Sequence, residues 1–474
     1  MSVILDSSGR PMAPAAPSNR RASGSLNGSA PSAFPYEASS WQTQEMGDWL
    51  PAIRSPDAEI NQFRDRMVAR SRDLVRNDGW AAGGITRILD NTVGAAFRLS
   101  ANPDYRALAA LTGNKAFDAG WAEEFRRTAE ALWRGYAEDI GRYNDVSRQL
   151  TVAQQIRLAF RHKLVDGDSL AVAYWLPERV GYGRARYSTS FLIVDPDRLS
   201  NPYQMMDTKH LRGGVEIDDH GVALAYHIRK AEQNDWYNMM EANTWERVDR
   251  EDEDGWQRVI HDFERDRAGQ NRGTGIFTPV LARFKMLARY YGIELQAATI
   301  AATFGTYVTS PYDPALVQDA LDGGPDGQAN ELNAYQELRT DWARERPAML
   351  NGARIPTLAP GESIESVAAA HPHSGFSEFS HEMLRTFAAA AGISAEQMTQ
   401  DWSKTNYSSA RAALLDSWKT LMRRTTEFKI GTATPMYASW LHEAMDLGEL
   451  PLPRNAPSFL EARTAYSKCD WLGV

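Results

Sequence analysis

The spacing of apolar residues changes twice along this chain, and this change restricts the fold more than any other feature of the sequence. Between residues 56 and 163 apolar residues recur mostly at helical spacing. Residues 169–263 instead contain short apolar or alternating runs bounded by turn residues, which is typical of β-strands. From residue 279 onward, helical spacing returns. Because the strands form one block between helical regions, the sequence predicts an α+β fold.

The strand block is predicted in detail from its apolar runs. Residues 218–221 (Asp-Asp-His-Gly) separate two runs and predict a hairpin loop. The predicted strands are 169–176, 188–194, 215–217, 222–229, 244–248 and 259–263.

Helix boundaries are indicated by capping residues. Gly392 is typical of a C-cap, and Ser394 with Gln397 forms a capping box that opens a short helix. The other predicted helices are 56–76, 80–97, 115–143, 151–163, 279–304, 328–346, 376–391 and 408–429. The apolar face of the last helix is formed by Leu414, Trp418, Leu421, Met422 and Phe428.

Five arginines crowd the predicted helix 56–76, at positions 64, 66, 70, 72 and 76. A solvated helix face is the ordinary interpretation of such a run. The alternative is that the arginines face acidic neighbours or nucleic acid.

Composition excludes several classes of protein. Residues 1–40 are rich in Ser, Ala, Pro, Gly and Asn, which predicts a disordered N-terminal arm. The single Cys469 excludes an intramolecular disulfide and a zinc site built from cysteines, which fits synthesis in a reducing cytoplasm. No apolar run is long enough to span a membrane. The net charge of −9 argues against static, tight binding of DNA but not against a channel in which DNA slides.

Motifs that would carry catalysis are weak or incomplete. The segment 269–275 is rich in glycine but lacks the Lys-Ser/Thr of a P-loop, so a structural turn is the better interpretation. Gly167-Asp168-Ser169 resembles a nucleophile turn only superficially. Asp195 and Asp197 could act as a carboxylate pair, but their setting favours a strand end that enters a proline turn. The sequence therefore predicts no catalytic residues and no cofactor.

Metal sites are equally poorly supported. Pro372 between His371 and His373 disfavours a helical ligand pair, and His381 completes no recognisable ligand set. The acidic run 249–254 fails the spacing of a calcium loop, because Arg250 would occupy the first ligand position. The sequence predicts no metal site.

Several segments taken together resemble the lambda-like family of portal proteins from tailed bacteriophages. NYSSAR, which comprises Asn406, Tyr407, Ser408, Ser409, Ala410 and Arg411, is the most specific of them. The remaining segments are RSRDLVRNDGWAAGGITRILDNTVG (70–94), GDSLAVAYWLP (167–177), VDPDRLSNP (194–202), GVEIDDHGVALAYHI (214–228) and the stretch 259–304. The resemblance covers most of residues 55–470.

The resemblance implies a phage portal fold with a wing, a two-helix stem, a small clip and a helical crown-proximal region, which assembles as a ring. It implies a dodecamer at the portal vertex of the virion, a channel for double-stranded DNA, and no enzymatic activity. The implied partners are the terminase large subunit, the major capsid protein and head–tail connector or adaptor proteins, with no membrane.

The resemblance also assigns regions and residues. The implied regions are the arm 1–40, wing 41–278, stem helices 279–304 and 375–392, clip 305–374, channel loop region 393–407, wing or crown-proximal helices 408–450 and C-terminal segment 451–474. The expected channel-loop residues are Thr399, Asp401, Lys404, Asn406 and Tyr407. The expected stem-packing residues are Phe284, Leu287 and Leu295, against the returning helix or a neighbouring subunit.

Two other classes remain open from the residues alone. One is another capsid-associated structural protein, such as a head–tail adaptor or minor head protein. The other is a soluble α/β enzyme with an unrecognised site. Large rings with a central hole would distinguish a portal from both.

Overall fold

The computed structural model describes residues 37–39, 44–94, 97–303, 306–309, 337, 340–341, 348–350, 353–355, 363–366, 375–403 and 405–473. The chain divides into two units, Met1–Arg54 and Ser55–Val474. In the first unit the described elements are a 3₁₀-helix, Glu37–Ser39, and the helix α1, Gln44–Gly47. Apart from residues 37–39, the predicted N-terminal arm lies outside the described residues.

The second unit begins with helices whose starts are capped by side chains. Ser55, Asp78, Asp104, Asp118 and Thr151 each accept a hydrogen bond from the backbone N–H three residues later, which satisfies a donor that the helix itself cannot. These caps precede α2 (Pro56–Ile60), α4 (Gly79–Thr92), α5 (Tyr105–Thr112), α6 (Ala119–Ala137) and α7 (Val152–Val165).

The predicted helix 56–76 is wrong as a single element. It is divided into α2 and α3, Arg64–Asn77, by a turn at residues 61–63. The side-chain amide of Asn61 in this turn donates a hydrogen bond of 2.8 Å to Asp207 Oδ2, far along the chain. The helix α5 was not predicted, and α6 is shorter than the predicted 115–143.

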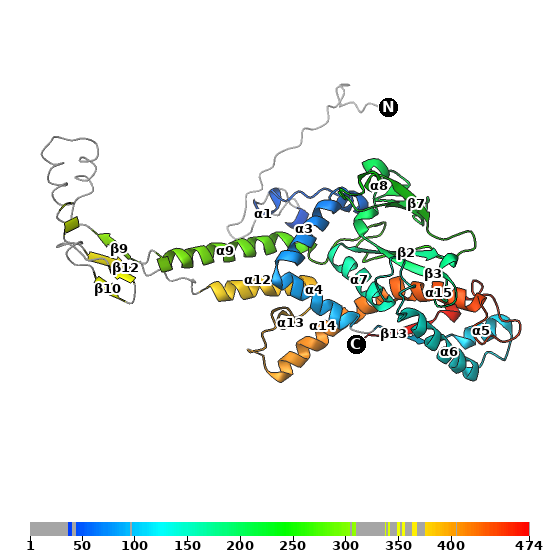
Figure 1. Cartoon of the computed structure of the whole chain (residues 1–474). Coiled ribbons are helices and arrows are strands. Elements are labelled where there is room, and N and C mark those ends of the chain that lie inside the picture. The colour runs from blue at the N-terminus through cyan, green and yellow to red at the C-terminus, as the bar shows by residue number, and fades with distance from the viewer. Residues whose placement is uncertain are drawn as a thin grey trace, which may run out of the picture. The chain divides into compact units, whose positions relative to one another are not determined.

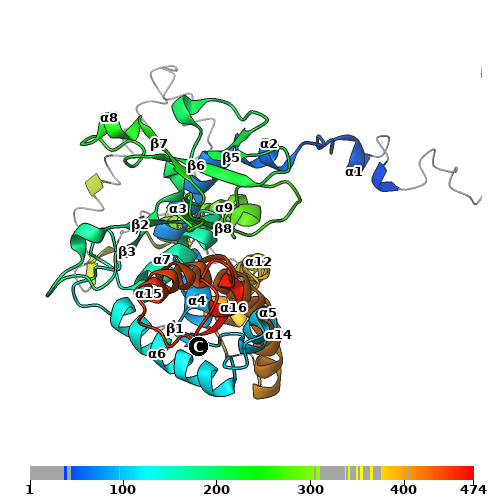
Figure 2. The ribbon, with the colours of Figure 1, turned by 90° about the vertical axis from the view of Figure 1, so that its right-hand side faces the viewer.

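Two antiparallel sheets follow, and they pack face to face (Figure 2). The first has the order β3-β2-β8, with β2 at Asp168–Trp175, β3 at Thr189–Val194 and β8 at Val259–Phe263. The second has the order β4-β5-β6-β7. Its strands are Leu211–Arg212, Val215–Ile217, Ala223–Arg229 and Trp245–Asp249.

Side chains along β2 alternate between two cores, as a pleated strand requires. Leu170 and Val172 face the second sheet, where they join the cluster of Val215, Tyr226 and Ile228. Ala171 and Ala173 point the other way, into the large core that α7 and α15 share. Figure 2 shows these layers: β5–β7, then β2, β3 and β8, then the helices. The first sheet is therefore buried on both faces.

The predicted hairpin is confirmed. Asp218 Oδ1 accepts hydrogen bonds of 2.8 Å from the N–H groups of His220 and Val222 and so holds the turn between β5 and β6. The other predicted strands match β2, β3, β7 and β8 to within a residue or two.

The C-terminal half is mainly helical. It contains α9 (Leu281–Thr303), α12 (Phe376–Ala391), α13 (Ala395–Thr399), α14 (Tyr407–Phe428) and α15 (Thr434–Asp446). Figure 1 shows α9 and α12 side by side. Gly392 adopts φ 68° and ends α12, as the sequence predicts.

The region between α9 and α12 contains strands that were not predicted. β9 (Thr306–Thr309) pairs with β12 (Ser363–Ser366), and β10 (Ala348–Leu350) pairs with β11 (Ala353–Ile355). Apart from three helical positions, Glu337, Thr340 and Asp341, the predicted helix 328–346 lies outside the described residues.

The chain ends beside an early segment. After α16 (Arg463–Tyr466), the strand β13 (Cys469–Leu472) pairs with β1 (Arg98–Ala101). Trp471 of β13 stacks on Phe97 and meets Trp133 of α6 edge-on, at ring-centroid distances of 5.3 and 6.0 Å. This aromatic packing closes the helical core around the chain end.

A short π-helix, Lys429–Ala433, joins α14 to α15 without a loop. Gly431 lies in this π-helix, and a Cβ at that position would stand 2.5 Å from the carboxyl group of Asp262 in β8. The glycine therefore permits a close approach between the helix and the first sheet.

Candidate functional site

The segment predicted as the channel loop joins α13 to α14. The predicted capping box of α13 is confirmed, since Ser394 and Gln397 exchange hydrogen bonds of 3.0 and 3.2 Å. Gln400 then adopts a left-handed conformation with φ 57°, which ends α13. The carboxylate of Asp401 accepts hydrogen bonds of 3.0 and 2.6 Å from the backbone and hydroxyl of Ser403. Lys404 lies outside the described residues.

The NYSSAR residues form the start of α14. Asn406 is its N-cap, with the side-chain oxygen accepting a hydrogen bond of 2.8 Å from Ser409 N–H. Tyr407 is 80% exposed, and Ser408, Ser409 and Arg411 are also exposed. The motif therefore starts a helix and presents side chains outward.

One face of α14 carries an exposed stripe, which we define as Tyr407, Arg411, Leu414, Leu415, Trp418 and Met422. Their spacing places them along one side of the helix. The expected apolar face is therefore only partly internal. Leu421 and Phe428 are buried within the chain, whereas Leu414, Trp418 and Met422 are each at least 40% exposed. A row of large apolar side chains on a surface is typical of a contact site.

Aromatic contacts hold α9 against α12 in antiparallel orientation. Phe284, near the start of α9, stacks on Phe387 near the end of α12, with ring centroids 3.6 Å apart. Further along α9, Tyr290 contacts Phe376 at the start of α12. Leu287 lies between these contacts and is 2% exposed.

Leu295 differs from the other two expected stem-packing residues. Phe284 and Leu287 are buried within the chain, but Leu295 is 70% exposed. Leu295 is therefore not buried within the single chain, and its burial against a neighbouring subunit stays a prediction.

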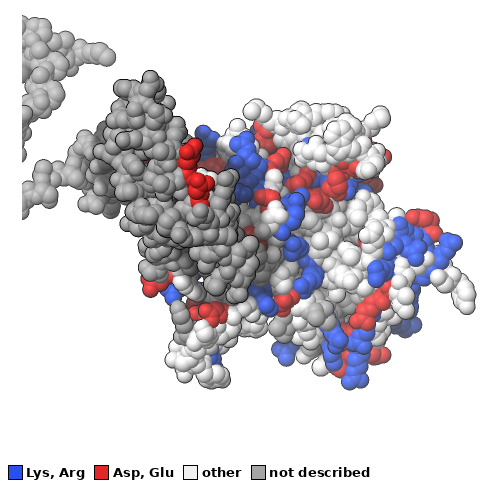
Figure 3. Space-filling model, turned by 60° about the vertical axis from the view of Figure 1, so that its left-hand side comes forward, with Lys and Arg blue, Asp and Glu red and all other residues white. Residues whose placement is uncertain are grey.

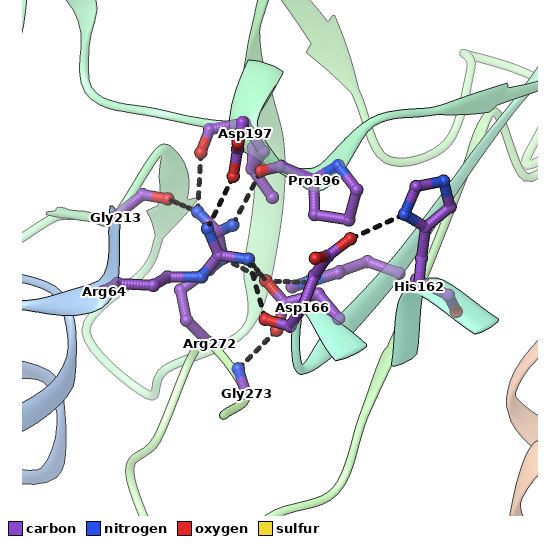
Figure 4. A network of polar contacts seen from close by, with 12 residues as sticks. Arg64, His162, Asp166, Pro196, Asp197, Gly213, Arg272 and Gly273 are labelled. Atoms are coloured by element: carbon purple, nitrogen blue, oxygen red, sulfur yellow. Dashed lines mark hydrogen bonds and ion pairs between the residues drawn. The ribbon is translucent and has the colours of Figure 1, made fainter. Parts of the chain in front are cut away.

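A buried ion cluster joins α3 to the first sheet (Figure 4). Asp168, at the start of β2, forms ion pairs with Arg272 and with Arg64, the latter at 3.1 Å. All three side chains are less than 5% exposed. Arg272 also donates hydrogen bonds of 2.6 to 2.9 Å to the carbonyl oxygens of Leu199, Gly213 and Pro196.

Arg72 extends this cluster toward the surface. It contacts the carboxylates of Asp166, Asp195 and Asp197 at 2.7, 2.6 and 2.8 Å. Asp166 also contacts His162 Nδ1 at 2.6 Å. The arginine run therefore divides: Arg64 and Arg72 face acidic neighbours, whereas Arg66, Arg70 and Arg76 are exposed.

Burial and charge act in opposite directions on these carboxyl groups. Burial raises the pKa of Asp168, but the charges of Arg272 and Arg64 outweigh it and hold that pKa well below its usual range. Burial dominates at Asp197, where the pKa is raised although Arg72 opposes the shift. Burial also lowers the pKa of His261, whose side chain lies 3.7 Å from Asp168.

The buried ion cluster gives a structural role to three motifs that could suggest a catalytic or phosphate-binding site: the 167–169 turn, the 269–275 loop and the Asp195–Asp197 pair. The Gly167–Ser169 turn and the 269–275 loop pack so closely that a Cβ on Gly273 would stand 2.0 Å from the carbonyl oxygen of Gly167. The 269–275 segment is therefore a structural turn, as predicted. Asp195 and Asp197 are engaged by Arg72 and form no pair facing a cavity of their own.

Neither a metal site nor a membrane span is found in the described part of the chain. No group of three or more His, Cys, Asp or Glu side chains in those residues could hold a metal ion. His371 and His373 lie outside the described residues. Among the described helices, none has the length and apolar character needed to cross a membrane.

The sequence offered acidic neighbours as one interpretation of the arginine run, but it did not identify which arginines are buried or which carboxylates they meet. Arg64 lies on the same face of α3 as Val68, Ser71 and Val75, all of which are buried. An arginine in register with a buried face requires an internal carboxylate partner.

Comparison with known proteins gives one consistent result. A family model described as "Phage portal protein, lambda family" matches residues 42–425. The portal protein of Escherichia phage N15 is 34% identical over 431 residues, which cover 90% of this chain and 78% of that protein. Portal protein B of Escherichia phage lambda is 34% identical over 437 residues, with the same two shares.

Two solved structures are similar to this chain at low sequence identity. A chain from the neck of a native gene transfer agent particle is 12% identical, with a TM-score of 0.41 over 73% of this chain and 84% of that chain. A chain from the neck of the empty particle is 13% identical, with a TM-score of 0.43 over 83% of this chain and 87% of that chain.

Proposed function

The chain belongs to the lambda family of phage portal proteins, and on that basis we propose that it forms a dodecameric ring at one capsid vertex. Double-stranded DNA would pass through this ring during packaging and ejection. As a portal protein the chain is a structural component of a bacteriophage virion and not an enzyme. Synthesis in the host cytoplasm is part of the proposal.

The surface of α9 and α14 is the observation that supports ring assembly most directly. Leu295 on α9 and the exposed stripe on α14 leave large apolar side chains in water in the single chain. Removing such surface from water stabilises an association by about 25 cal/mol per Å². A ring would cover this surface on every subunit.

The arrangement of α9 and α12 supports the proposed regions. Two antiparallel helices that frame the segment 304–375 suit a two-helix stem with a clip between its helices. We assign the wing to 41–278, the stem to 279–304 and 375–392, and the clip to 305–374. The remaining proposed regions are the arm 1–40, channel loop region 393–407, wing or crown-proximal helices 408–450 and C-terminal segment 451–474.

The charge of the surface suits a channel that does not grip DNA. In the view of Figure 3 acidic and basic side chains are interspersed over the described surface. A net charge of −9 per subunit would weaken persistent contacts with DNA phosphates, since each such contact adds salt-dependent affinity. We propose that Thr399, Asp401, Lys404, Asn406 and Tyr407 lie near the DNA path.

Docking of other virion and packaging proteins completes the proposal. The terminase large subunit would bind the clip during packaging, head–tail connector or adaptor proteins would replace it later, and the major capsid protein would surround the ring. Tyr407 and Arg411 are exposed. In this proposal they lie at the channel and at the contacts between subunits, and not at a docking site for these partners.

Electron microscopy of the purified chain tests the proposal. Negative-stain images should show rings with a central hole, and mass photometry should give particles of about twelve subunits. Monomers, or compact particles without a hole, would contradict it. A Trp418→Glu variant serves as the internal comparison, because it changes only the exposed stripe and should yield single subunits.

A further inference from the structure

A small cavity lies where the β5–β6 hairpin approaches β8, and it is separate from the proposed channel and stem. Its volume is about 220 Å³. Val215, Val222, Val259 and Phe263 supply apolar walls. The cavity has room for a small side chain or ion, and too little for a drug-sized molecule.

Tyr226 supplies a hydroxyl group to this cavity. The residue is 5% exposed, and its ring meets His261 edge-on at 5.5 Å. The hydroxyl has no hydrogen-bond partner among the described residues, yet it is not sealed from solvent. Because this hydroxyl reaches solvent but has no partner in the described part of the chain, its donor is free to bind a group from outside. A group that enters the cavity could accept its hydrogen bond.

Two arginines lie beside that hydroxyl. Arg250 and Arg265 line the same cavity as Tyr226. Burial raises the pKa of Tyr226, and the charges of these two arginines oppose that shift. Arg265 packs over the ring of Phe263 at 5.3 Å and has no ion pair within the described part of the chain. Arg250 has one long, exposed contact, 3.9 Å from Nε to Glu251.

The residues that line the cavity include no carboxylate. Two arginines and a hydroxyl donor without an internal acceptor form a set that matches an oxyanion, since guanidinium groups bind planar carboxylates through paired hydrogen bonds. The apolar walls would accommodate an aliphatic stem. Arg265 has no ion pair in the described part of the chain and Arg250 has only one long contact, so the positive charge in the cavity is weakly compensated and favours an anionic occupant.

We propose that this cavity binds a single carboxylate group, carried by a glutamate side chain of another protein of the virion. The proposal deepens the docking role of the proposed function and rests on it. The cavity would act as an anchor point that fixes where one acidic residue of a partner is seated.

A DNA phosphate fits this cavity less well than a carboxylate. The acidic side chains of residues 251–254 follow Arg250 directly and are exposed. DNA carries one charge per about 1.7 Å of its axis, so it would bring many phosphates close to this run. A single carboxylate on an otherwise uncharged segment avoids that repulsion.

Calorimetric titration of the full-length protein tests the proposal. The probes are the capped tripeptide Ala-Glu-Ala, its Ala-Gln-Ala counterpart, inorganic phosphate and a short DNA duplex. We expect the glutamate peptide to bind about tenfold more tightly than the glutamine peptide. The double variant Arg250→Gln/Arg265→Gln should abolish this preference, and Tyr226→Phe should reduce it about threefold.

A matched variant separates the cavity from general surface charge. Arg66→Gln/Arg70→Gln removes two exposed arginines of α3 and the same net charge, and should leave the preference intact. Equal binding of the two peptides, or equal loss in both double variants, would overturn the proposal. Tighter binding of phosphate or duplex that disappears with Arg250 and Arg265 would also overturn it and assign the cavity to a phosphate.

Negative-stain images of the same samples distinguish failure of the carboxylate site from failure of the proposed ring. If the parent protein forms rings but shows no peptide preference, only the carboxylate site fails. If the peptide preference is present but no rings form, the portal ring fails and the cavity remains a carboxylate site without the proposed docking role.

Discussion

Around Asp168 the buried charges are paired within the chain, whereas along α14 large apolar side chains remain exposed. Arg64 and Arg272 lie less than 5% exposed with their carboxylate partner in the same chain. On α14, Trp418 and Leu415 stand in water although the neighbouring Leu421 is buried. The sheet region thus pairs its buried charges within the described chain, while α14 keeps large apolar side chains on the surface of the single chain, where the proposed ring would cover them.

The largest effect is expected from Asp168→Asn. This change leaves two buried guanidinium groups without their carboxylate, and breaking such a buried pair costs about 3–5 kcal/mol. Urea unfolding of the isolated subunit measures the loss. Asp73→Asn on the exposed side of α3 is the control and should change the free energy of unfolding by less than about 0.5 kcal/mol. Equal free energies of unfolding for the two variants would show that the buried ion pairs of Asp168 do not stabilise the sheet region.

Leu287→Asp should have the next largest effect, because it places a carboxylate in the α9–α12 contact. We expect a loss of a few kcal/mol and the absence of uniform rings. Met286→Asp alters the adjacent, exposed position and should leave subunit stability nearly unchanged. Normal dodecamers of Leu287→Asp would contradict the assigned packing.

Acid should weaken the sheet region progressively. The pKa of Asp168 in the folded chain lies below its value in the unfolded chain, which is about 3.9. Its stabilisation is therefore complete above that value and is lost as pH falls through the folded pKa. Thermal midpoints of the parent should fall as the pH is lowered from about 4 toward about 2, and Asp168→Asn should show a shallower decline. If the thermal midpoints of the parent and of Asp168→Asn fall equally with pH, protonation of Asp168 does not cause the loss of stability in acid.

A smaller effect on the subunit, but a complete effect on assembly, is expected from Trp418→Glu. The side chain is 40% exposed, so unfolding should change by no more than about 0.5 kcal/mol. Rings should nevertheless be lost in mass photometry. Leu421→Glu, one turn away on the buried side, should unfold the subunit instead. Intact rings in Trp418→Glu would place the interface elsewhere.

The smallest structural effect is expected from Lys404→Glu, a prediction that rests on the sequence and on family membership. Ring assembly and thermal stability should be nearly unchanged. Packaging or retention of DNA should change, because a ring would present many copies of a short-lived phosphate contact. A variant that packages and retains DNA like the parent at every salt concentration would exclude Lys404 from the DNA path.

Local patterns predicted the elements that local physics determines. The strand β2 is apolar over nearly its whole length, α12 ends at a glycine, and α13 opens with a capping box, so each could be recognised from a few neighbouring residues. The hairpin at Asp218 is of the same kind. These elements carry their own start and stop signals.

Elements that depend on distant partners were missed. β1 alternates between exposed and buried residues, but it is only four residues long, too short to be recognised without β13, with which it pairs more than three hundred residues later. The break after Ile60 is marked by Asn61, which binds Asp207. For the candidate site, NYSSAR was recognised, but the exposure of Trp418 could not be predicted, because an apolar face looks the same whether its own chain or another copy covers it.

The close approach at Gly431 has a mechanical consequence. From Tyr407 to Asp446 the chain is helical without a loop, and Figure 1 shows that α14 and α15 meet at an angle across the π-helix. Gly431 lies in this joint, close to the carboxyl group of Asp262 in β8. A larger side chain at residue 431 would therefore force the joint away from β8, so this single position sets how closely the helical region approaches the first sheet.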